Sequence, residues 1–502
     1  MSDIWLDSPY LQDSNAMWLK GNLHTHTNRS DGAASPQDMI RTYAGYHHDF
    51  LMISDHDTLS DYTGLDDCGL LLLPGSEVSG ASQHVLDVGA RVSVGDGGSH
   101  QDLLDRIVRD SGFPVLCHPN WEEDFDHYPF ASMLALQGYV GTEIFNGVVM
   151  DMPGSHLAVD KWDRLLGAGR RIWGFANDDA HAIPQTGRGW NVVRVRERSV
   201  AAVLDALRSG SFYASCGVEI ETIACDGHRL RVKAPNADRI VVFGQHGKRI
   251  RFVDGSDLKL DVDELFEPYV RVECYGRRGT SAWTQPFQIR GGTYEKMQER
   301  LAELGTMARS SLRAYRADRA PVVTGNVDDP LWAKAELHDR FMKMQDGSPA
   351  PVRTELRCIL ADDTLFFGVR CHEPLLDQVG DGTGPKALWA DDSLEFFLDF
   401  EGAGHTYCQL VVNASGETAA GWRGPSHYAA PKVRAKTGRW KGASGQGWSV
   451  EFAVPVAEFS PSPGKRWGFH VCRNRRPVRG TFMWSWVGHS NHNADRYGSL
   501  ML

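Results

Sequence analysis

The stretch 17-MWLKGNLHTHTNRSDG-32 decides the fold of the N-terminal half, because it joins an apolar run to a set of polar side chains. His24 and His26 follow that run, and Asp31 lies shortly after them. Residues two apart on an extended strand face the same side, so the two imidazoles are placed to bind one ion together. A chain with 20 histidines can contain such a pair by chance. A metal site is therefore indicated only together with the residues that follow.

Side chains of the same kinds recur as far as residue 181. Imidazole and carboxylate groups are the ligands that suit Zn, Mn and Fe. The predicted metal ligands are His24, His26, Asp31, His56, Glu77, His84, His118, Asp179 and His181. No single ion uses so many ligands, so the sequence predicts a centre that holds more than one ion.

The same region alternates between predicted strands and predicted helices. Apolar runs end just before candidate ligands, at 50–53, 70–73, 113–117 and 172–176. Helices that begin at serines are predicted at 35–46, 99–112 and 199–210. This alternation favours a parallel α/β architecture, and in an α/β barrel the functional residues gather at the carboxyl ends of the strands.

Residues 18–215 resemble the PHP (polymerase and histidinol phosphatase) superfamily of metallohydrolases. The matching motifs, in the family order, are LHTHT, SDG, SDHD, GSE…H, CHP and DDAH. The resemblance is greatest to the carbaryl-hydrolase-like branch, in which a β-rich segment follows the catalytic domain, as 212–289 does here. It implies an α/β fold, a distorted (β/α)7 barrel, with two or three divalent ions (Mn, Fe or Zn). The substrate-facing loops 47–48, 121–123 and 185–190 match nothing in the family.

The resemblance also divides the ligands among three ions. The first would be held by His24, His26, Glu77 and Asp179, the second by Glu77, His84 and His118, and the third by Asp31, His56 and His181. Glu77 would bridge the first two ions. The remaining acidic and histidine side chains are expected to be ordinary buried or orienting groups: Asp55, Asp57, Asp178, His47, His48, His100 and His127.

A metal-dependent hydrolase is the function that this set predicts. The ions would lower the pKa of a bound water, supply a hydroxide and take up negative charge on the attacked group. His181 or Asp57 would protonate the leaving group, and Arg29 and Arg188 are candidates to hold an anionic substrate. Phosphoester hydrolysis of a small, sugar-containing substrate is the main prediction. The alternatives are hydrolysis of a carbamate, ester, amide or glycosidic bond, and a non-catalytic sugar-binding protein.

The composition excludes some classes of partner. The chain has 502 residues, 42% of them hydrophobic, and a net charge of −11, without the basic stripe that nucleic acid requires. It has no apolar run of membrane-spanning length. Nine scattered cysteines indicate reduced thiols, and the polar start MSDIWLDSPYLQDSN indicates no signal peptide. A cytoplasmic protein is expected, and a homodimer remains open.

Beyond the predicted barrel (1–215) the pattern divides into three parts. Residues 216–291 predict a small β-rich domain. Within 292–320, apolar residues three or four apart predict a connecting helix at 293–316. Residues 321–502 predict a β-sandwich, with Asp362 and Asp363 in a turn. This part resembles the family 9 carbohydrate-binding module in GNVDDPLW, WADDSLEFFLDF, QLVVNASGE and RYGSLML.

The resemblance implies a sugar partner for the sandwich, and its tryptophans are the candidates for contact. Trp422 and Trp440 have loop-like surroundings and are the predicted sugar-binding residues, because an exposed indole offers a flat apolar face. Three others, Trp332, Trp448 and Trp467, are expected in the core. Acidic residues such as 391–392 would bind Ca²⁺ or cap a strand. A role in dimer contacts, or as a lid, remains open for the sandwich.

Overall fold

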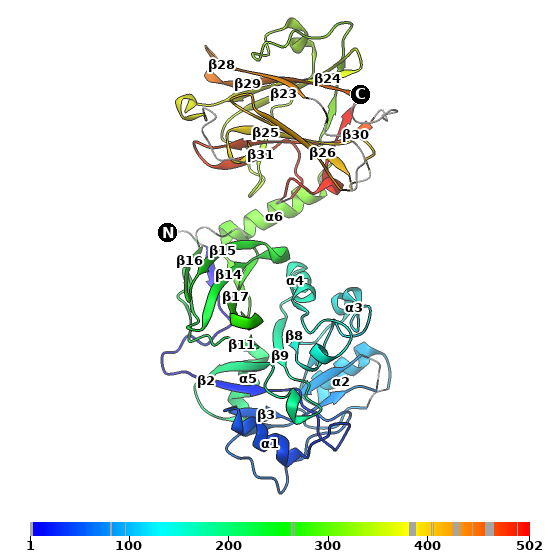
Figure 1. Ribbon diagram of the computed structural model, residues 1–502, viewed down its shortest axis with the longest axis vertical. Helices are drawn as coiled ribbons and strands as arrows, with labels where there is room; N and C mark the ends of the chain where they lie inside the picture. The colour runs from blue at the N-terminus through cyan, green and yellow to red at the C-terminus, as the bar shows by residue number, and fades with distance from the viewer. Residues whose placement is uncertain are drawn as a thin grey trace. The chain divides into compact units, whose positions relative to one another are not determined.

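The computed structural model describes residues 4–80, 83–95, 97–262, 265, 267–380, 388–402, 404, 406–424, 431, 433–443, 445–456, 466–488 and 490–502. The chain divides into two compact units, Met1–Tyr294 and Glu295–Leu502, and both consist mostly of β-sheet (Figure 1). No helix in the described ranges is long and apolar enough to cross a membrane. All nine cysteines are free thiols, as predicted.

Two sheets position the candidate ligands of the first unit. The larger sheet has the order β1-β19-β17-β18-β11-β10-β2-β3-β4, with β14 and β15 attached through β17. Its strands are β1 (Trp5–Asp7), β2 (Met17–Asn22), β3 (Phe50–Met52), β4 (Leu71–Leu73), β10 (Trp190–Val195), β11 (Phe212–Ser215), β14 (Ala237–Phe243), β15 (Arg249–Asp254), β17 (Tyr269–Gly276), β18 (Ser281–Thr284) and β19 (Phe287–Arg290). The smaller sheet runs in chain order: β5 (Gly75–Val78), β6 (Val85–Val88), β7 (Phe113–Leu116), β8 (Gly141–Asn146) and β9 (Trp173–Asn177).

Strand direction departs from the purely parallel prediction. The pairs β2–β3, β3–β4, β7–β8 and β8–β9 are parallel, but β6 is antiparallel to both neighbours and β10 to β2. A short loop joins β5 to β6, and a loop of that length permits only an antiparallel return. Single parallel bridges, Thr25 to Ala180 and His56 to Glu77, connect the two sheets at their ligand-bearing ends. The (β/α)7 barrel as predicted is therefore not confirmed.

The three helices predicted within residues 1–215 form close to their expected bounds. The helices are α1 (Pro36–Gly45), α2 (His100–Asp110), α3 (Phe130–Ala135), α4 (Val159–Gly167), α5 (Val200–Ser209) and α6 (Gly292–Thr306). The hydroxyls of Ser35, Ser99 and Ser199 cap α1, α2 and α5 by accepting backbone N–H bonds. Gly210 ends α5 in the left-handed conformation at φ 85°. The core between the sheets holds large apolar side chains such as Phe50, Phe113 and Phe175.

The small β-rich segment continues the larger sheet and adds a second layer. The second layer is β12 (Thr222–Cys225), β13 (Arg229–Lys233) and β16 (Asp257–Asp261). A buried ion cluster fixes α4 to β17: the guanidinium of Arg271, 1% exposed, donates to both oxygens of Asp163 at 2.7 Å and also bonds Glu273. The segment is thus tied to the predicted catalytic part.

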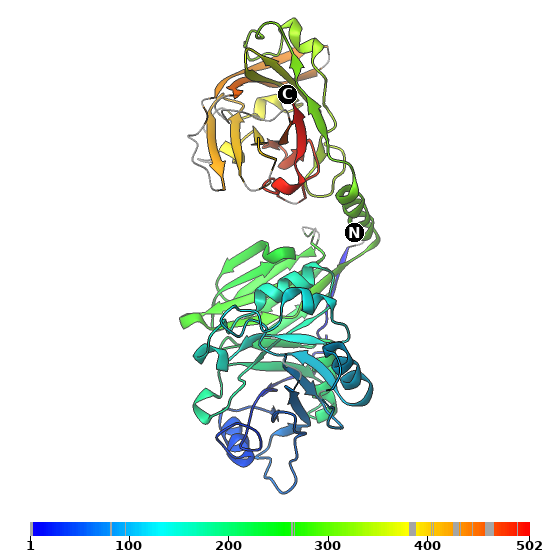
Figure 2. The ribbon, with the colours of Figure 1, turned by 90° about the vertical axis from the view of Figure 1, so that its right-hand side faces the viewer.

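The second unit contains two facing sheets (Figure 2). One has the order β20-β32-β30-β25-β26-β27, with β22 and β31 beside β30: β20 (Ser311–Arg313), β22 (Met342–Lys343), β25 (Ser393–Asp399), β26 (Tyr407–Asn413), β27 (Thr418–Arg423), β30 (Arg466–Arg475), β31 (Gly480–Met483) and β32 (Gly498–Met501). The other is β21 (Tyr315–Arg316), β23 (Thr354–Ala361), β24 (Thr364–His372), β29 (Gly445–Pro455) and β28 (Arg434–Gly442). Asp362 and Asp363, at φ 46° and 52°, form the predicted turn.

The connecting helix is shorter than predicted. Helix α6 ends at Thr306, and residues 311–316, predicted as helix, instead form β20 and β21. These two short strands pair in parallel with β32 and β23. Pairing with two existing sheet edges satisfies their backbone groups, and this tertiary preference outweighs the helical spacing of the apolar residues.

We expect the buried ion cluster at Arg271 to contribute strongly to the free energy of unfolding of the first unit. Arg271→Met leaves Asp163 and Glu273 buried without their cation, which costs about 3–5 kcal/mol. Chemical unfolding of the full chain measures the change. The matched control is Arg231→Met, which breaks a solvent-exposed pair with Asp257 and is expected to change little. Equal unfolding curves for wild type and Arg271→Met would contradict the expectation.

Candidate metal centre

Each predicted metal ligand of the first unit lies within a strand, next to the end of a strand, or in the loop that follows a strand. The ligands His24 and His26 follow β2, His56 follows β3, and His118 follows β7. Glu77 lies within β5, His84 directly precedes β6, and Asp179 and His181 follow β9. Asp31 lies in the loop after β2, and side-chain distances of 3.8 Å or less connect all nine residues at one edge of the two sheets.

Two of these ligands have a strained backbone. His118 has φ 30° and Asp179 has φ 54°, in the left-handed region that residues with a side chain rarely adopt. Such conformations cost of order 1–3 kcal/mol each and persist where the surroundings fix them, often at functional sites. Position 32 of the SDG motif requires glycine for a steric reason, because a Cβ there would lie 2.6 Å from the backbone oxygen of His26.

The first predicted ligand group is the most tightly built. Nε2 of His24 lies 3.1 Å from both Glu77 Oε2 and Asp179 Oδ1. Nε2 of His26 lies 3.2 Å and 3.1 Å from the same two oxygens. All four side chains are buried. Two imidazoles and two carboxylates therefore point one atom each at a common centre.

None of these four atoms has a hydrogen-bond partner among the described residues: His24 Nε2, His26 Nε2, Glu77 Oε2 and Asp179 Oδ1. Buried polar atoms without partners are costly and rare in folded proteins. A divalent ion at their meeting point would satisfy all four, and nitrogen and carboxylate oxygen are donors that Zn, Mn and Fe accept. The donor set therefore fits a metal ion.

The other two predicted groups adjoin the first. Glu77 Oε1 lies 3.0 Å from His84 Nδ1 and 3.4 Å from His118 Nε2, so the two oxygens of one carboxylate face different groups. Asp31 Oδ2 lies 3.3 Å from His181 Nε2 and 3.6 Å from His56 Nε2. His26, whose Nδ1 also lies near Asp31, joins this third group. Asp31 is the most exposed member.

The electrostatics of the first group favour positive charge. Burial by itself lowers the pKa of His26, yet the carboxylates of Asp179 and Glu77 raise it to about 9. Burial likewise opposes a charged His24, and the same carboxylates raise its pKa well above the usual value. Burial raises the pKa of Asp179, but the imidazoles of His24 and His26 outweigh it and lower that pKa. The carboxylates stay ionised and attract protons or metal cations.

Glu143, which was not predicted from the sequence, orients two of the predicted ligands. It is buried on β8, and its Oε1 accepts a bond of 2.8 Å from Nδ1 of His24. Its Oε2 accepts from the backbone N–H of His118, also at 2.8 Å. A proton fixed on Nδ1 leaves Nε2 of His24 free for a metal. A charged residue within the fully buried run GTEIFN was the available signal.

Several residues expected to be ordinary buried groups support the ligand loops. Asp55 accepts bonds from the N–H and hydroxyl of Thr27, both at 2.6 Å, and so holds the loop after His26. Asp178 accepts backbone N–H bonds from residues 187–189. Nε2 of His127 accepts from the backbone N–H of His84, and its Nδ1 bonds Glu122, so both ring nitrogens have partners.

The other catalytic candidates lie outside the ligand cluster. Asp57 is exposed, and its carboxylate accepts bonds from the N–H and hydroxyl of Ser79 at 3.0 Å and 2.9 Å. Arg29 donates to the backbone oxygen of Asp61. Arg188 donates to Asp151 at 2.7 Å and to the backbone oxygen of Gly147. None of the three lines the cavity at the centre.

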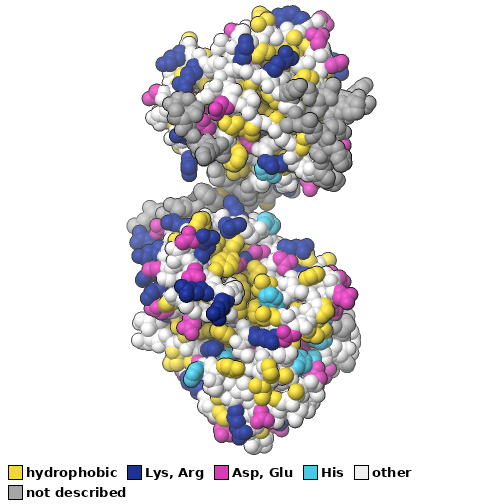
Figure 3. Space-filling view, viewed as in Figure 1, with side chains coloured by type: hydrophobic (Ala, Val, Ile, Leu, Met, Phe, Trp, Pro, Cys, Tyr) yellow, Lys and Arg dark blue, Asp and Glu magenta, His cyan; other side chains and the backbone are white. Residues whose placement is uncertain are grey.

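A cavity of about 190 Å³ opens at the centre and has both polar and apolar lining residues. Predicted metal ligands, among them Asp31, His56 and Glu77, supply the polar part of the lining. Trp121, Val148, Val149 and Met152 supply the apolar part. Histidine and apolar side chains also reach the surface of the first unit (Figure 3). The cavity can therefore hold a group that has both polar and apolar parts.

In the second unit, the predicted sugar-binding tryptophans are half-buried. The ring of Trp422 packs against Phe400 at 5.4 Å, and Trp440 lies 4.8 Å from the ring of His372. Trp389, which was not singled out, is 58% exposed and lines a pocket. Of the candidate Ca²⁺ ligands, Asp392 accepts N–H bonds from Gly380 and Arg476, as a strand cap would. The core predictions Trp332, Trp448 and Trp467 are confirmed as buried.

Comparison with known proteins gives two family matches, each to part of the chain. A family model described as PHP-associated matches residues 169–212, which include Asp179 and His181. A model described as carbohydrate family 9 binding domain-like matches residues 323–502. These matches support the resemblance to both families, but not its carbaryl-hydrolase-like branch. No curated protein matches the chain.

Solved structures show only weak similarity. A two-domain protein from Bacteroides vulgatus, with a predicted PHP-like metal-dependent phosphoesterase, is 17% identical over 56% of this chain and 90% of its own, with a TM-score of 0.34. A family 9 carbohydrate-binding module from Caldicellulosiruptor kristjanssonii, in complex with cellotriose, is 17% identical over 38% and 93%, with a TM-score of 0.30. Scores this low support no conclusion about fold or function.

We expect Glu143 to act on metal binding through His24. Glu143→Gln keeps the size of the side chain but weakens the bond that fixes the His24 proton, so metal affinity should fall about 10–100-fold. Titration of the metal-stripped full chain with Zn²⁺ and Mn²⁺ measures this. The exposed Glu219→Gln, in the same unit, is the matched control and should leave both affinities unchanged. An unaltered affinity in Glu143→Gln would remove Glu143 from the centre.

Proposed function

We propose that the first unit is a metal-dependent hydrolase, and most specifically a phosphoesterase of the PHP type. The observation that carries the proposal is the convergence of four buried, partnerless ligand atoms from His24, His26, Glu77 and Asp179. The PHP-associated match over 169–212 supports it. We also propose that β2, β3 and β5 to β9, joined by the two single bridges, correspond to the distorted seven-stranded barrel of that family.

Two or three divalent ions, when bound, would supply positive charge that activates a water and stabilises charge on the attacked group. The chain's own residues arrange that charge. Glu77, with one oxygen directed to each of two ligand groups, would hold two ions side by side. Asp31, His56 and His181 would hold a third at the more exposed end. The apolar side chains of Val148 and Val149 in the lining would help to exclude bulk water.

His181 is the better-placed candidate for proton transfer to the leaving group. Its Nδ1 donates to the backbone oxygen of Asp179 at 2.9 Å, so Nε2 is the atom left to bind an ion or to exchange a proton at the cavity. Asp57 faces Ser79 instead, outside the cavity. Arg29 and Arg188 would need to leave their present partners to hold an anionic substrate.

The bond that we propose is hydrolysed is a phosphoester. It fits because several cations at one site neutralise the charge of a phosphoryl group. The alternative is a carbamate, ester, amide or glycosidic bond, which the apolar lining residues Trp121 and Met152 would equally accommodate. An inert barrel in a sugar-binding protein is the second alternative, and partnerless ligand atoms argue against it.

We further propose that the second unit binds sugar in the pocket beside Trp389. The carbohydrate-binding match over 323–502 supports a sugar ligand. The indole of Trp389 offers an exposed face for stacking on a sugar ring, whereas Trp422 and Trp440 contact neighbouring rings. A substrate that contains a sugar would then agree with both proposals, hydrolysis by the first unit and sugar binding by the second.

We expect the purified wild-type protein to contain two to three divalent ions per chain. The Glu77→Ala variant should lose both the bound ions and the hydrolytic activity. Removal of the shared carboxylate deprives two ligand groups of an oxygen, while the fold should persist. Elemental analysis measures the ions, and assays with Mn, Fe and Zn on phosphoesters, aryl esters, carbamates and aryl glycosides measure turnover. Protein that binds no metal after reconstitution would refute the enzyme proposal, and equal turnover in Glu77→Ala would refute the bridge.

We expect Trp389→Ala to weaken sugar binding by the full-length chain about tenfold, because it removes the aromatic face on which the apolar face of a sugar ring would stack. The loss of a stacking contact between an aromatic side chain and a nucleobase, which is of similar size, costs about 1–3 kcal/mol. Titration calorimetry with simple sugars measures the loss. Trp440→Ala removes an indole of equal size outside the pocket and serves as the control. If Trp440→Ala or Trp422→Ala abolishes binding and Trp389→Ala does not, the sugar site lies where the sequence predicted it.

A further inference from the structure

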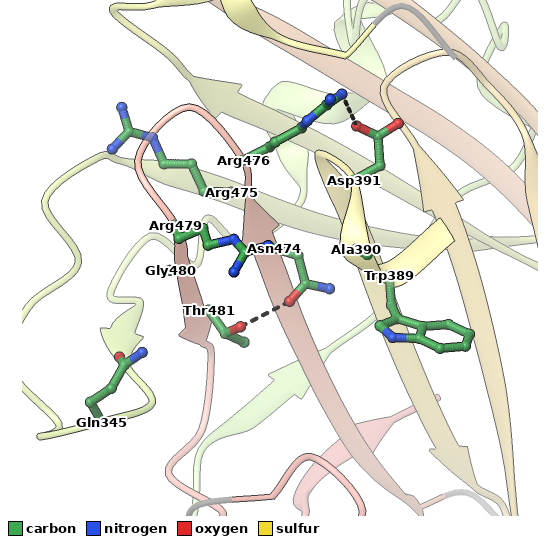
Figure 4. Close-up of a pocket in the computed structure, with 10 residues that line it drawn as sticks. All are labelled: Gln345, Trp389, Ala390, Asp391, Asn474, Arg475, Arg476, Arg479, Gly480 and Thr481. Atoms are coloured by element: carbon green, nitrogen blue, oxygen red, sulfur yellow. Dashed lines mark hydrogen bonds and ion pairs between the residues drawn. The ribbon is translucent and has the colours of Figure 1, made fainter. Parts of the chain in front are cut away.

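The pocket beside Trp389 is built mainly from one hairpin of the second unit (Figure 4). Its volume is about 570 Å³, enough for a monosaccharide or a disaccharide. Trp389 lines one side, and Asn474, Arg475, Arg476, Arg479 and Thr481 from β30, β31 and the turn between them line the other. A rigid, paired hairpin therefore presents most of the polar groups.

The polar floor of the pocket is already ordered. The hydroxyl of Thr481 donates to Oδ1 of Asn474 at 3.0 Å. The amide nitrogen of Asn474 donates to Glu395 at 2.7 Å, and the second oxygen of Glu395 accepts from Gln409 at 2.6 Å. These bonds fix which way the amide of Asn474 faces. The floor is thus a preorganised hydrogen-bonding surface rather than a set of loose side chains.

The arginines of the pocket differ in how far they are neutralised. Arg475 donates two bonds of 2.7 Å to the buried carboxylate of Glu373, so its charge is matched. Arg476 has only a longer contact, 3.5 Å, with Asp391. Arg479 is exposed, and within the described residues no hydrogen bond or ion pair engages its guanidinium. The lining thus offers an unmatched cation above the ordered floor.

The nearby carboxylates do not compensate for Arg479. Glu395 lies beneath Asn474 and is occupied by the amide groups of Asn474 and Gln409. Asp392 is buried and accepts backbone N–H bonds from Gly380 and from Arg476, the first residue of the turn that carries Arg479, and it forms no ion pair with Arg479 among the described residues. Asp391 is the one carboxylate of the described lining, and it faces Arg476. With a neutral sugar in the pocket, the guanidinium of Arg479 would have no charged partner among the described residues.

We propose that this pocket selects a sugar that carries an acidic group, a carboxylate or a phosphate, and that Arg479 contacts that group. The inference rests on the proposed sugar-binding function and adds the class of ligand. A guanidinium binds carboxylate and phosphate through two parallel N–H bonds, a geometry that neutral hydroxyl groups do not match. Trp389 would stack on the ring while Asn474 and Thr481 bond its hydroxyl groups. The acidic sugar is then held on three sides.

Titration calorimetry of the full-length chain tests the inference with three sugars, glucose, glucuronate and glucose 6-phosphate, and with inorganic phosphate alone. We expect glucuronate or glucose 6-phosphate to bind about tenfold more tightly than glucose, the effect of one hydrogen-bonded charge pair. The preference should shrink as salt rises. Arg479→Gln should remove the preference. Arg434→Gln, an exposed arginine on β28, is the matched control and should keep it.

The outcomes distinguish the proposed sugar binding from the proposed selection of an acidic sugar. Equal affinities for glucose and both acidic sugars would overturn the selection of charge and leave the sugar-binding proposal standing. Binding of inorganic phosphate as tight as that of glucose 6-phosphate would overturn it as well, because the pocket would then be an anion site. If none of the sugars binds the folded chain, the sugar-binding function itself fails. An unchanged preference in Arg479→Gln, with unfolding like wild type, would exclude Arg479 as the contact.

Discussion

One buried carboxylate organises the first unit. Glu77 is 1% exposed, and its two oxygens lie within 3.4 Å of imidazole nitrogens from five histidines: His24, His26, His56, His84 and His118. A buried carboxylate without cations would be strongly destabilising, so the surrounding strands must deliver positive groups to it. The two sheets, the bridges between them and the strained backbone at His118 together place the imidazoles around this carboxylate.

The positions of the predicted ligands at strand ends could be inferred from the sequence because the constraints on those positions are local. A histidine or aspartate just after a buried apolar run lies at a strand end wherever that strand pairs, and serine caps mark helices without tertiary information. The predicted bounds of α1, α2 and α5 agree with the structure for this reason. The grouping of nine ligands at one edge followed from motif order, which the PHP-associated match supports over part of the chain.

What the sequence could not provide depended on contacts between distant residues. The antiparallel direction of β6 is set by a short loop and its neighbours, and the strands β20 and β21 form only because two sheet edges accept them. Glu143 looked like one acidic residue among many until it lay under His24. The exposure of Trp389, 58%, depends on the folded second unit, and the sequence around this residue does not indicate it.

The bridge between Thr25 and Ala180 has a consequence for how the protein is made. The first ligand group combines His24, near the start of the chain, with Asp179, so a ribosome must release some 180 residues before that group can exist. Until then Glu77 has only part of its cation environment. A metal ion held by this group would therefore be bound only after those residues have been made, and the metals available at that time would determine which ion the centre first acquires.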